Sequence, residues 1–313
     1  MSLFKRFSKA LAMSLSVVCM FISTPNAASA YDTNGLMFYY DFTELTSAAD
    51  NASLADFSGN HRNGTIKGTG LTYNPVTRSL TFPGGSNGTG YVELSGAFST
   101  FTSGLTIEFE GEFGNNLSEW ERIFDFGVPG GAAEDFWVGQ MADSHELALE
   151  TWIGGVNQVR CHTATDGSAL DNSRTFSKWL ITVDRTSGCR IYKDGVELQT
   201  QIKNGDYTSD TAVQAHGSAY PLPAVSTRTA NFVGRSNWED DGDFEGSIRY
   251  LRLYNRALTP NQVLDNATNN EPTGRTSSGG LAATGFDASV YLLAAGVLVT
   301  VGVLLGRRKG SKS

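Results

Sequence analysis

The sequence predicts an all-β protein in which two antiparallel sheets pack as a sandwich or jelly roll. Short segments rich in aromatic and β-branched residues alternate with clusters of Gly, Asn, Asp and Ser, which is the pattern of strands joined by turns. The 313 residues include 35 Gly and 8 Pro, with 11% aromatic and 18% charged residues. No sustained helical periodicity separates the expected strands, so the pattern argues against a helical bundle and against a parallel βαβ fold.

The expected strands cover most of the chain between residues 36 and 255. In chain order they are LMFYYDF (36–42), LTFPG (80–84), YVEL (91–94), LTIEFEGEF (105–113), RIFDFG (122–127), DFWVGQ (135–140), LALETWI (147–153), QVRCH (158–162), WLITVDR (179–185), CRIYKDG (189–195), ANFVGR (230–235) and SIRYLRLYN (247–255). Trp179 alternates with Ile181 and Val183, so we expect it in the core.

Local motifs define the turns and the end of the domain. Lys-Asp-Gly at 193–195 is a hairpin signal. Thr259 with Gln262 three residues later forms a capping box, and Pro260 suits the first position of a short helix. Residues 266–280 lose apolar side chains and become rich in Asn, Thr, Ser and Gly, which is typical of a linker. The sequence therefore predicts one folded domain over residues 31–265.

The first 30 residues have the three parts of a secretory signal peptide. A basic region (5–9) precedes an apolar run (10–22), and Ala-Ser-Ala at 28–30 forms a small-residue cleavage site. We expect cleavage after Ala30, which leaves Tyr31 at the start of the exported protein.

The C-terminal end combines a pentapeptide, an apolar run and a basic tail. The pentapeptide consists of Leu281, Ala282, Ala283, Thr284 and Gly285. Residues 288–306 contain no charge, and a basic tail begins at Arg307. As a helix this run would be about 28 Å long, which is enough to cross a bilayer core.

These three parts, in this order, resemble the sorting signals of Gram-positive surface proteins in the Leu-Ala-x-Thr-Gly variant. The resemblance implies that a sortase cuts between Thr284 and Gly285 and joins Thr284 to a cell-wall precursor. We therefore expect the protein at the cell wall. The alternative is a plain membrane anchor through the C-terminal helix.

The net charge changes when the two ends are set aside. Over the whole chain, 24 Lys and Arg stand against 32 Asp and Glu, a net charge of −8. The ends hold seven of the basic residues and one of the acidic residues, so the segment 31–284 has a net charge of about −14. This charge gives no basis for binding nucleic acid, and it favours neutral glycans or basic protein surfaces as partners.

The exported segment contains two cysteines, Cys161 and Cys189, both in expected strands. Two thiols in an oxidising compartment predict one disulfide, and the alternative is a pair of buried thiols.

Several motifs occur in the order of a known family. DFSGNHRNGTIKG (56–68) precedes SLTFPG, YVEL and LTIEFEGEF, then WERIFDFG, KWLITVD and CRIYKDGVEL follow, and VGRSNWEDDGDFEGSIRYLRLYNRALT (233–259) comes last. Over residues 36–264 this order resembles the laminin G-like branch of concanavalin A-like jelly rolls. The resemblance implies a jelly roll of two antiparallel sheets. It also implies carbohydrate binding, protein adhesion or a role as an accessory module of a glycosidase.

Glu108, Glu110 and Glu112 lie on one face of an expected strand, with Ile107 and Phe109 on the other. The segment resembles the Glu-x-Asp-x-Glu strand of laminarinase-type glycosidases, in which two carboxyls act as nucleophile and acid/base. The alternative is a solvated acidic face of an amphipathic strand.

A calcium ion is the cofactor that the acidic loop near residue 240 suggests. Asp240, Asp241 and Asp243 lie close together around a glycine, and carboxylate oxygens are the ligands that Ca²⁺ takes. The family resemblance adds Asp56 and Asn60, which match an Asp-x-Ser-Gly-Asn segment that holds structural Ca²⁺. The alternative is a charged surface loop.

Tryptophans beside carboxylates are candidates for stacking on sugar rings. Trp152 shares a strand face with Glu150, Trp137 shares one with Asp135, and Trp238 lies beside the acidic loop. We therefore expect Trp137, Glu150, Trp152 and Trp238 to contact a ligand, and the alternative is a role in packing.

Together these features predict a cell-wall-anchored surface protein whose jelly roll binds a carbohydrate or a surface or matrix protein. The alternatives are a glycoside hydrolase acting through Glu108 and Glu112, and a structural wall protein with no ligand of its own.

Overall fold

The computed structural model describes residues 31–268 apart from residues 87, 97–100, 102, 116–117, 129–134, 154–155, 164–168, 171–172, 205–212 and 216–227. The chain divides into two compact units, 1–271 and 272–313, and every described residue belongs to the first. The expected signal peptide and sorting signal lie outside the described residues. Within the described residues, no helix has the length and apolar character needed to cross a membrane.

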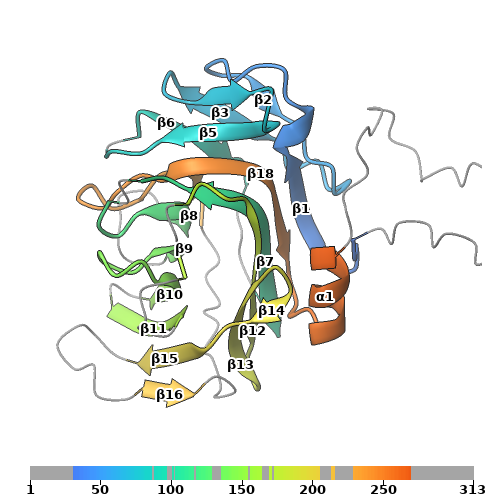
Figure 1. Ribbon diagram of the computed structural model, residues 1–313, viewed down its shortest axis with the longest axis vertical. Helices are drawn as coiled ribbons and strands as arrows, with labels where there is room; N and C mark the ends of the chain where they lie inside the picture. Colours follow the sequence, from blue (N-terminus) through green and yellow to red (C-terminus); the bar gives the residue numbers. More distant parts are fainter. Residues whose placement is uncertain are drawn as a thin grey trace, which may run out of the picture. The chain divides into compact units, whose positions relative to one another are not determined.

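The first of two antiparallel sheets has the order β14-β13-β12-β7-β18-β5-β4, with β1 paired to β18 (Figure 1). Its strands are β1 (Leu36–Asp41), β4 (Thr72–Asn74), β5 (Ser79–Pro83), β7 (Gly104–Phe113), β12 (Ser177–Asp184), β13 (Gly188–Lys193), β14 (Val196–Glu197) and β18 (Glu245–Tyr254).

The second sheet has the order β16-β15-β11-β10-β9-β8-β17-β6-β3-β2. Its strands are β2 (Ser53–Leu54), β3 (Gly64–Gly68), β6 (Gly90–Leu94), β8 (Arg122–Gly127), β9 (Phe136–Gln140), β10 (Leu147–Ile153), β11 (Val156–Thr163), β15 (Thr200–Asn204), β16 (Val213–Ala215) and β17 (Ala230–Val233). The all-β architecture of two antiparallel sheets is confirmed, and each expected segment lies on a strand.

The main core lies between the two sheets, because each strand turns alternate side chains inward. On β7, Ile107 and Phe109 are at most 1% exposed and belong to this core. Phe136 contributes from the second sheet. Trp179 is also in the core, as expected, and its ring meets that of Phe113 edge to face with centroids 5.8 Å apart.

A disulfide joins the two sheets across this core. Cys161 on β11 bonds to Cys189 on β13, with their Cα atoms 6.3 Å apart and a sequence separation of 28. The expected pairing is confirmed. Because the bond ties one sheet to the other, it limits how far the sandwich can open.

The expected turn and helix are both present. Asp194 and Gly195 have positive φ angles of 52° and 80° between β13 and β14, as a tight hairpin requires. Helix α1 (Pro260–Thr268) begins with the expected capping box: the Thr259 amide donates to Oε1 of Gln262 at 2.9 Å, and the Gln262 amide donates back to Oγ1 of Thr259 at 3.4 Å. A single-turn 3-10 helix, η1 (Phe42–Glu44), follows β1.

The domain ends later than the sequence predicts. Helix α1 continues to Thr268, whereas the linker was expected to begin at residue 266. Asn266 is only 3% exposed, and its amide donates to Glu108 at 2.7 Å. The polar residues of the expected linker are therefore not all at the surface, since Asn266 makes a buried hydrogen bond.

Candidate functional site

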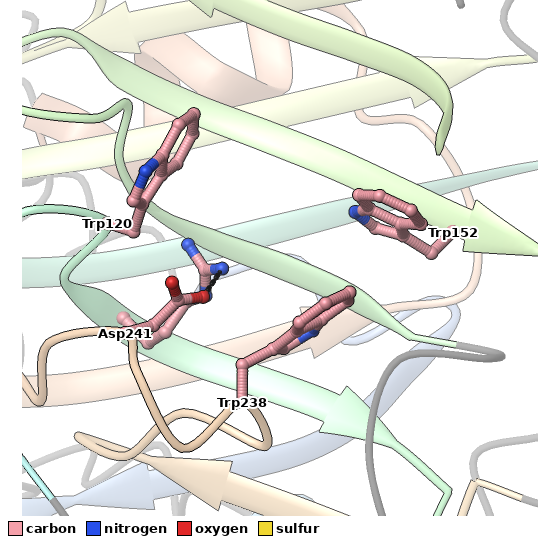
Figure 2. Close-up of a pocket in the computed structure, with 5 residues that line it drawn as sticks. Trp120, Trp152, Trp238 and Asp241 are labelled. Carbon is pink, nitrogen blue, oxygen red and sulfur yellow. Dashed lines mark hydrogen bonds and ion pairs between the residues drawn. The ribbon is translucent and has the colours of Figure 1, made fainter. Parts of the chain in front are cut away.

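Three tryptophans line a pocket on the face of the second sheet that points away from the main core. The pocket has a volume of about 350 Å³, and it is lined by Trp120, Arg122, Trp152, Trp238 and Asp241. Figure 2 shows Trp120 on one side and Trp152 and Trp238 on the other. This volume lies within the range of small-ligand sites, about 300–1,000 Å³.

The floor of the pocket is a row of cross-strand partners on four neighbouring strands. Asp125 on β8 pairs with Trp137 on β9, Trp137 with Glu150 on β10, and Glu150 with Arg160 on β11. Each of these four residues is at most 3% exposed. Because paired residues point their side chains to the same face, the pairing places two acids, an indole and a guanidinium side by side beneath the pocket.

Trp152 and Trp238 form one aromatic wall. Their ring centroids are 5.1 Å apart with the planes inclined by 55°. The indole N–H of Trp152 donates to Oε1 of Glu150 at 2.5 Å, and that of Trp238 donates to Oδ2 of Asp135 at 2.7 Å. Both rings are therefore oriented by buried carboxylates, and they present their faces and edges to the pocket.

Trp120 forms the opposite wall from a constrained loop. Its φ angle is +56°, and its amide donates to the carbonyl of Ala142, itself at φ +50°, at 3.1 Å. The side-chain amide of Gln140 holds the same two turns together, because its Nε2 donates to the carbonyls of Ser118 at 3.0 Å and Ala142 at 2.8 Å. A left-handed conformation is costly for a bulky residue, and such strain gathers at functional sites.

Arg122 connects the floor to the loop between β17 and β18. Its guanidinium lies 3.7 Å from the ring centroid of Trp137 and bonds to the carboxylate of Asp241. Its Nε is also 3.7 Å from Asp125. The Arg122 side chain is 4% exposed and that of Asp241 is 17% exposed, so Asp241 is the charged group of this pair that is more accessible to a ligand.

Burial changes the protonation of the acids around the pocket. It raises the pKa of Asp241 to about 6, against the opposing effect of Arg122. It raises the pKa of Asp135 to about 8, and the charge of Asp125 acts in the same direction. Near neutral pH, Asp241 is therefore mostly ionised, whereas Asp135 mostly holds its proton.

Of the residues predicted to contact a ligand, Trp152 and Trp238 lie together in the pocket. Trp137 and Glu150 do not reach it, because both are 0% exposed. Neither residue lines the pocket, and contact of these two residues with a ligand stays a prediction. The alternation of β9 and β10 places the two side chains on the correct face, but the indole of Trp120 packs over Trp137, with ring centroids 6.1 Å apart.

Trp120 and Arg122 are functional candidates that sequence reasoning missed. Trp120 belongs to a polar loop rather than to a strand, so the alternation of side chains along a strand does not predict which way it points. Arg122 begins β8, where the register shifts between Arg122 and Phe124. A signal was nevertheless present: Trp120 lies two residues before Arg122, which is the first residue of a strongly apolar strand.

Asp56 and Asn60, which were predicted to bind calcium, form hydrogen bonds with backbone groups of the protein. Oδ1 of Asp56 accepts from the amides of Tyr39 and Ser58, and Oδ2 accepts from the amide of Arg62, each at 2.9 Å. The side-chain amide of Asn60 donates to the carbonyl of Leu36 at 2.9 Å.

The three acids of the second loop are placed as follows. Asp241 pairs with Arg122, Asp243 accepts from the amide of Gly88 at 2.7 Å, and Asp240 is exposed. Among the described residues, no group of three or more His, Cys, Asp or Glu side chains is arranged to hold a metal ion. As they lie here, these residues do not fit a calcium site, and calcium binding stays a prediction.

The three glutamates of β7 do lie on one face, but the first is buried. Glu108 is 0% exposed and bonds to Nη1 of Arg252 at 2.9 Å and to the hydroxyl of Tyr250 at 3.0 Å. Glu110 bonds to Nη1 of Arg249 at 2.6 Å, and Glu112 accepts from Oγ of Ser247 at 2.9 Å. A saccharide cannot reach Glu108, so Glu108 and Glu112 are not an accessible pair of carboxyls in this structure.

Comparison with known families agrees with this fold. Residues 86–264 match the Laminin_G_3 family of the concanavalin A-like lectin/glucanases superfamily. The match covers more than half of the chain, so the protein belongs to this family. No curated protein matches the chain in sequence.

Several solved structures share the fold at low sequence identity. Domain 4 of AbnA, an extracellular arabinanase from Geobacillus stearothermophilus in complex with arabinotriose, is 19% identical with a TM-score of 0.50, over 74% of this chain and 98% of that domain. The binding domain of Botulinum Neurotoxin DC in complex with SialylT is 13% identical with a TM-score of 0.50, over 75% of this chain. The binding domain of Paraclostridial Mosquitocidal Protein 1 is 16% identical with a TM-score of 0.50, also over 75% of this chain. The chain spans about half the length of the two toxin domains.

Proposed function

We propose that this protein is a carbohydrate-binding protein of the cell surface and that the three-tryptophan pocket is its ligand site. The observation that carries the proposal is the arrangement of Trp120, Trp152 and Trp238 around an Arg122–Asp241 pair. All three indoles are half-buried. They expose apolar ring surface that the fold leaves uncovered.

The chemistry of the pocket suits a saccharide. A sugar ring has apolar C–H faces that stack on indoles, and hydroxyl groups that need hydrogen-bond partners. Asp241 supplies an accessible acceptor beside the indoles. The floor beneath, with Trp137 and Glu150, holds the wall residues in place. The side chains therefore lose little conformational freedom when a ligand binds.

The fold-level comparisons are compatible with this role. The arabinanase domain is in complex with a trisaccharide, and its similarity to this chain extends over nearly its whole length. At 19% identity this likeness is an analogy of fold, so the argument for a ligand site rests on the pocket of this chain.

A protein ligand and an enzymatic role are less well supported. The pocket is small and concave, whereas protein partners bury about 800 Å² per side on a broad surface. The glycosidase alternative depends on Glu108, which is buried in an ion pair with Arg252.

We propose further that the domain is displayed on the cell wall through the sorting signal at 281–285. The support is the order of signal peptide, pentapeptide, apolar run and basic tail in the sequence. Fractionation of cells tests it: muramidase is expected to release the protein, and release by detergent alone would contradict wall attachment.

A glycan array with the purified full-length protein tests the binding role. We expect a defined set of saccharides to bind, and the same set to lose binding to a Trp152→Ala variant. The matched control is Tyr73→Ala, which removes a half-buried aromatic residue from β4, on the other sheet. If no saccharide binds, or if both variants bind like the wild type, the proposed role is wrong.

A further inference from the structure

Two of the donors around the pocket are already used within the protein. The indole N–H groups of Trp152 and Trp238 donate to Glu150 and Asp135. The guanidinium of Arg122 is less exposed than the carboxylate of Asp241, at 4% against 17%. A ligand that reaches Trp152, Trp238 and Asp241 therefore meets ring faces and a carboxylate, which accept hydrogen bonds from the ligand's own donors.

Asp241 is the accessible negative charge of the pocket. Its side chain is 17% exposed, whereas that of Arg122, its partner, is 4% exposed, and Arg160 beneath the pocket is paired with Glu150. Burial raises the pKa of Asp125 and of Asp135, which favours the uncharged form of both acids. An acidic sugar would be repelled by the carboxylate of Asp241, and a cationic group would be attracted.

The hydrogen bonds of the indoles act in the same direction. An indole whose N–H donates to a carboxylate carries more electron density in its ring, because the acceptor's charge polarises it. Cations bind to the negative face of an aromatic ring, most strongly for tryptophan. Trp152 has this arrangement with Glu150, and the ring of Trp238 adjoins that of Trp152, with centroids 5.1 Å apart.

We propose that the pocket selects a saccharide that carries a protonated primary amine, an amino sugar whose nitrogen is not acylated, over neutral and acidic sugars of the same shape. The ammonium group lies against the faces of Trp152 and Trp238 and donates to Asp241, while the sugar ring stacks on the remaining aromatic surface. This inference rests on the proposed function, since it names the class of saccharide for the same site.

The test compares three trisaccharides that differ only at one position of each ring: β-1,4-linked glucosamine, N-acetylglucosamine and glucose. Binding of each to the full-length protein is measured by isothermal titration calorimetry at neutral pH and low salt. We expect the glucosamine trimer to bind at least about tenfold more tightly than the other two, which a cation–π contact and one charge-assisted hydrogen bond can supply. In about 1 M NaCl, where the Debye length is about 3 Å, the advantage should shrink.

Equal affinity for the three trimers would overturn the inference and leave the carbohydrate-binding role intact. Failure of the glucosamine trimer to bind would also overturn it, and the glycan array then decides the broader role separately. The salt dependence is measured on the wild-type protein alone, so this test does not depend on whether variant proteins fold.

Two matched variants locate the preference. Asp241→Asn removes the accessible carboxylate and should abolish the preference for the amine, so that the glucosamine trimer no longer binds more tightly than the other two. Glu239→Gln removes an exposed carboxylate from the same loop that does not line the pocket, and should keep the preference. If both variants lose the preference for the glucosamine trimer equally, the preference depends on net charge alone. That result would contradict the assignment of the preference to Asp241.

Discussion

The guanidinium of Arg122 lies 3.7 Å from the ring centroid of Trp137 and bonds at the same time to Asp241. One side chain thus joins the buried floor of the second sheet to the loop that carries Trp238. The geometry of the pocket therefore depends on residues that no ligand touches, and substitutions in the floor and in the walls should have different consequences.

A substitution in the floor should reduce stability. Trp137→Ala removes a 0% exposed side chain from beneath Arg122, and loss of a buried tryptophan costs about 3–5 kcal/mol. Trp152→Ala, in the half-buried wall, should reduce the free energy of unfolding by less, because part of its ring already faces solvent. Urea denaturation of both variants measures the difference, and similar losses would contradict the division into floor and walls.

Glu108→Gln should destabilise the domain without altering glycan binding. The substitution removes the charge opposite Arg252 in an ion pair whose side chains are both 0% exposed, and breaking such a pair costs about 3–5 kcal/mol. Glu112→Gln on the same face is the control, since Glu112 is half-buried and bonds to Ser247. Chemical denaturation and calorimetry with a bound glycan measure the two effects. Loss of glycan cleavage in a stable Glu108→Gln protein would instead favour an enzyme.

Removing the disulfide should cost about 3–4 kcal/mol, because the bond joins two cysteines with a sequence separation of 28 and so restricts the unfolded chain. The variant with both Cys161→Ala and Cys189→Ala should show this loss in thermal unfolding. Reductant should lower the Tm of the wild type and leave that of the variant unchanged. A reductant effect of equal size on both proteins would contradict a structural role for the bond.

Stability should fall as the pH rises from about 4 to about 8. Burial raises the pKa of Asp135 to about 8, and that of Glu121 to about 8 as well, whereas both are near 4 in an unfolded chain. The folded protein therefore holds protons that the unfolded chain has lost. This contribution is fully present below about pH 4 and is lost as the pH rises through about 8.

Asp135→Asn should make this fall less steep, because the asparagine cannot ionise beside Asp125 and Glu150. Arg122 also faces Asp135, and it opposes the effect only partly. The measurement is the Tm of both proteins from about pH 4 to about pH 8, the range between the unfolded and folded pKa of Asp135, with the exposed Glu239→Gln as control. A Tm profile of Asp135→Asn that matches the wild type would rule out Asp135 as a source of the pH dependence.

Much of the fold could be predicted from the sequence, because strand alternation and helix capping are local. The pattern of β7 places Ile107 and Phe109 inward, and the Thr259–Gln262 box marks the start of α1. The end of α1 could not be predicted, since the burial of Asn266 depends on Glu108, which is distant in sequence and adjacent only in the fold.

The site could be predicted only in part for a similar reason. Alternation states which face of a strand a tryptophan occupies, but it does not state whether a loop covers that face. Trp152 stayed at the surface of the pocket, whereas Trp137 was covered by Trp120 and Arg122. The covering residues come from loops and strand ends, where sequence periodicity carries no information.

The most direct test of the carbohydrate-binding site is the affinity of the full-length protein for the best saccharide from the array, measured by calorimetry for the wild type and for Trp152→Ala and Trp238→Ala. The pocket geometry predicts a loss of at least about tenfold in each variant, consistent with the removal of an aromatic anchor, together with a Tm close to that of the wild type. Unchanged affinity in both folded variants would contradict the assignment of ligand binding to this pocket.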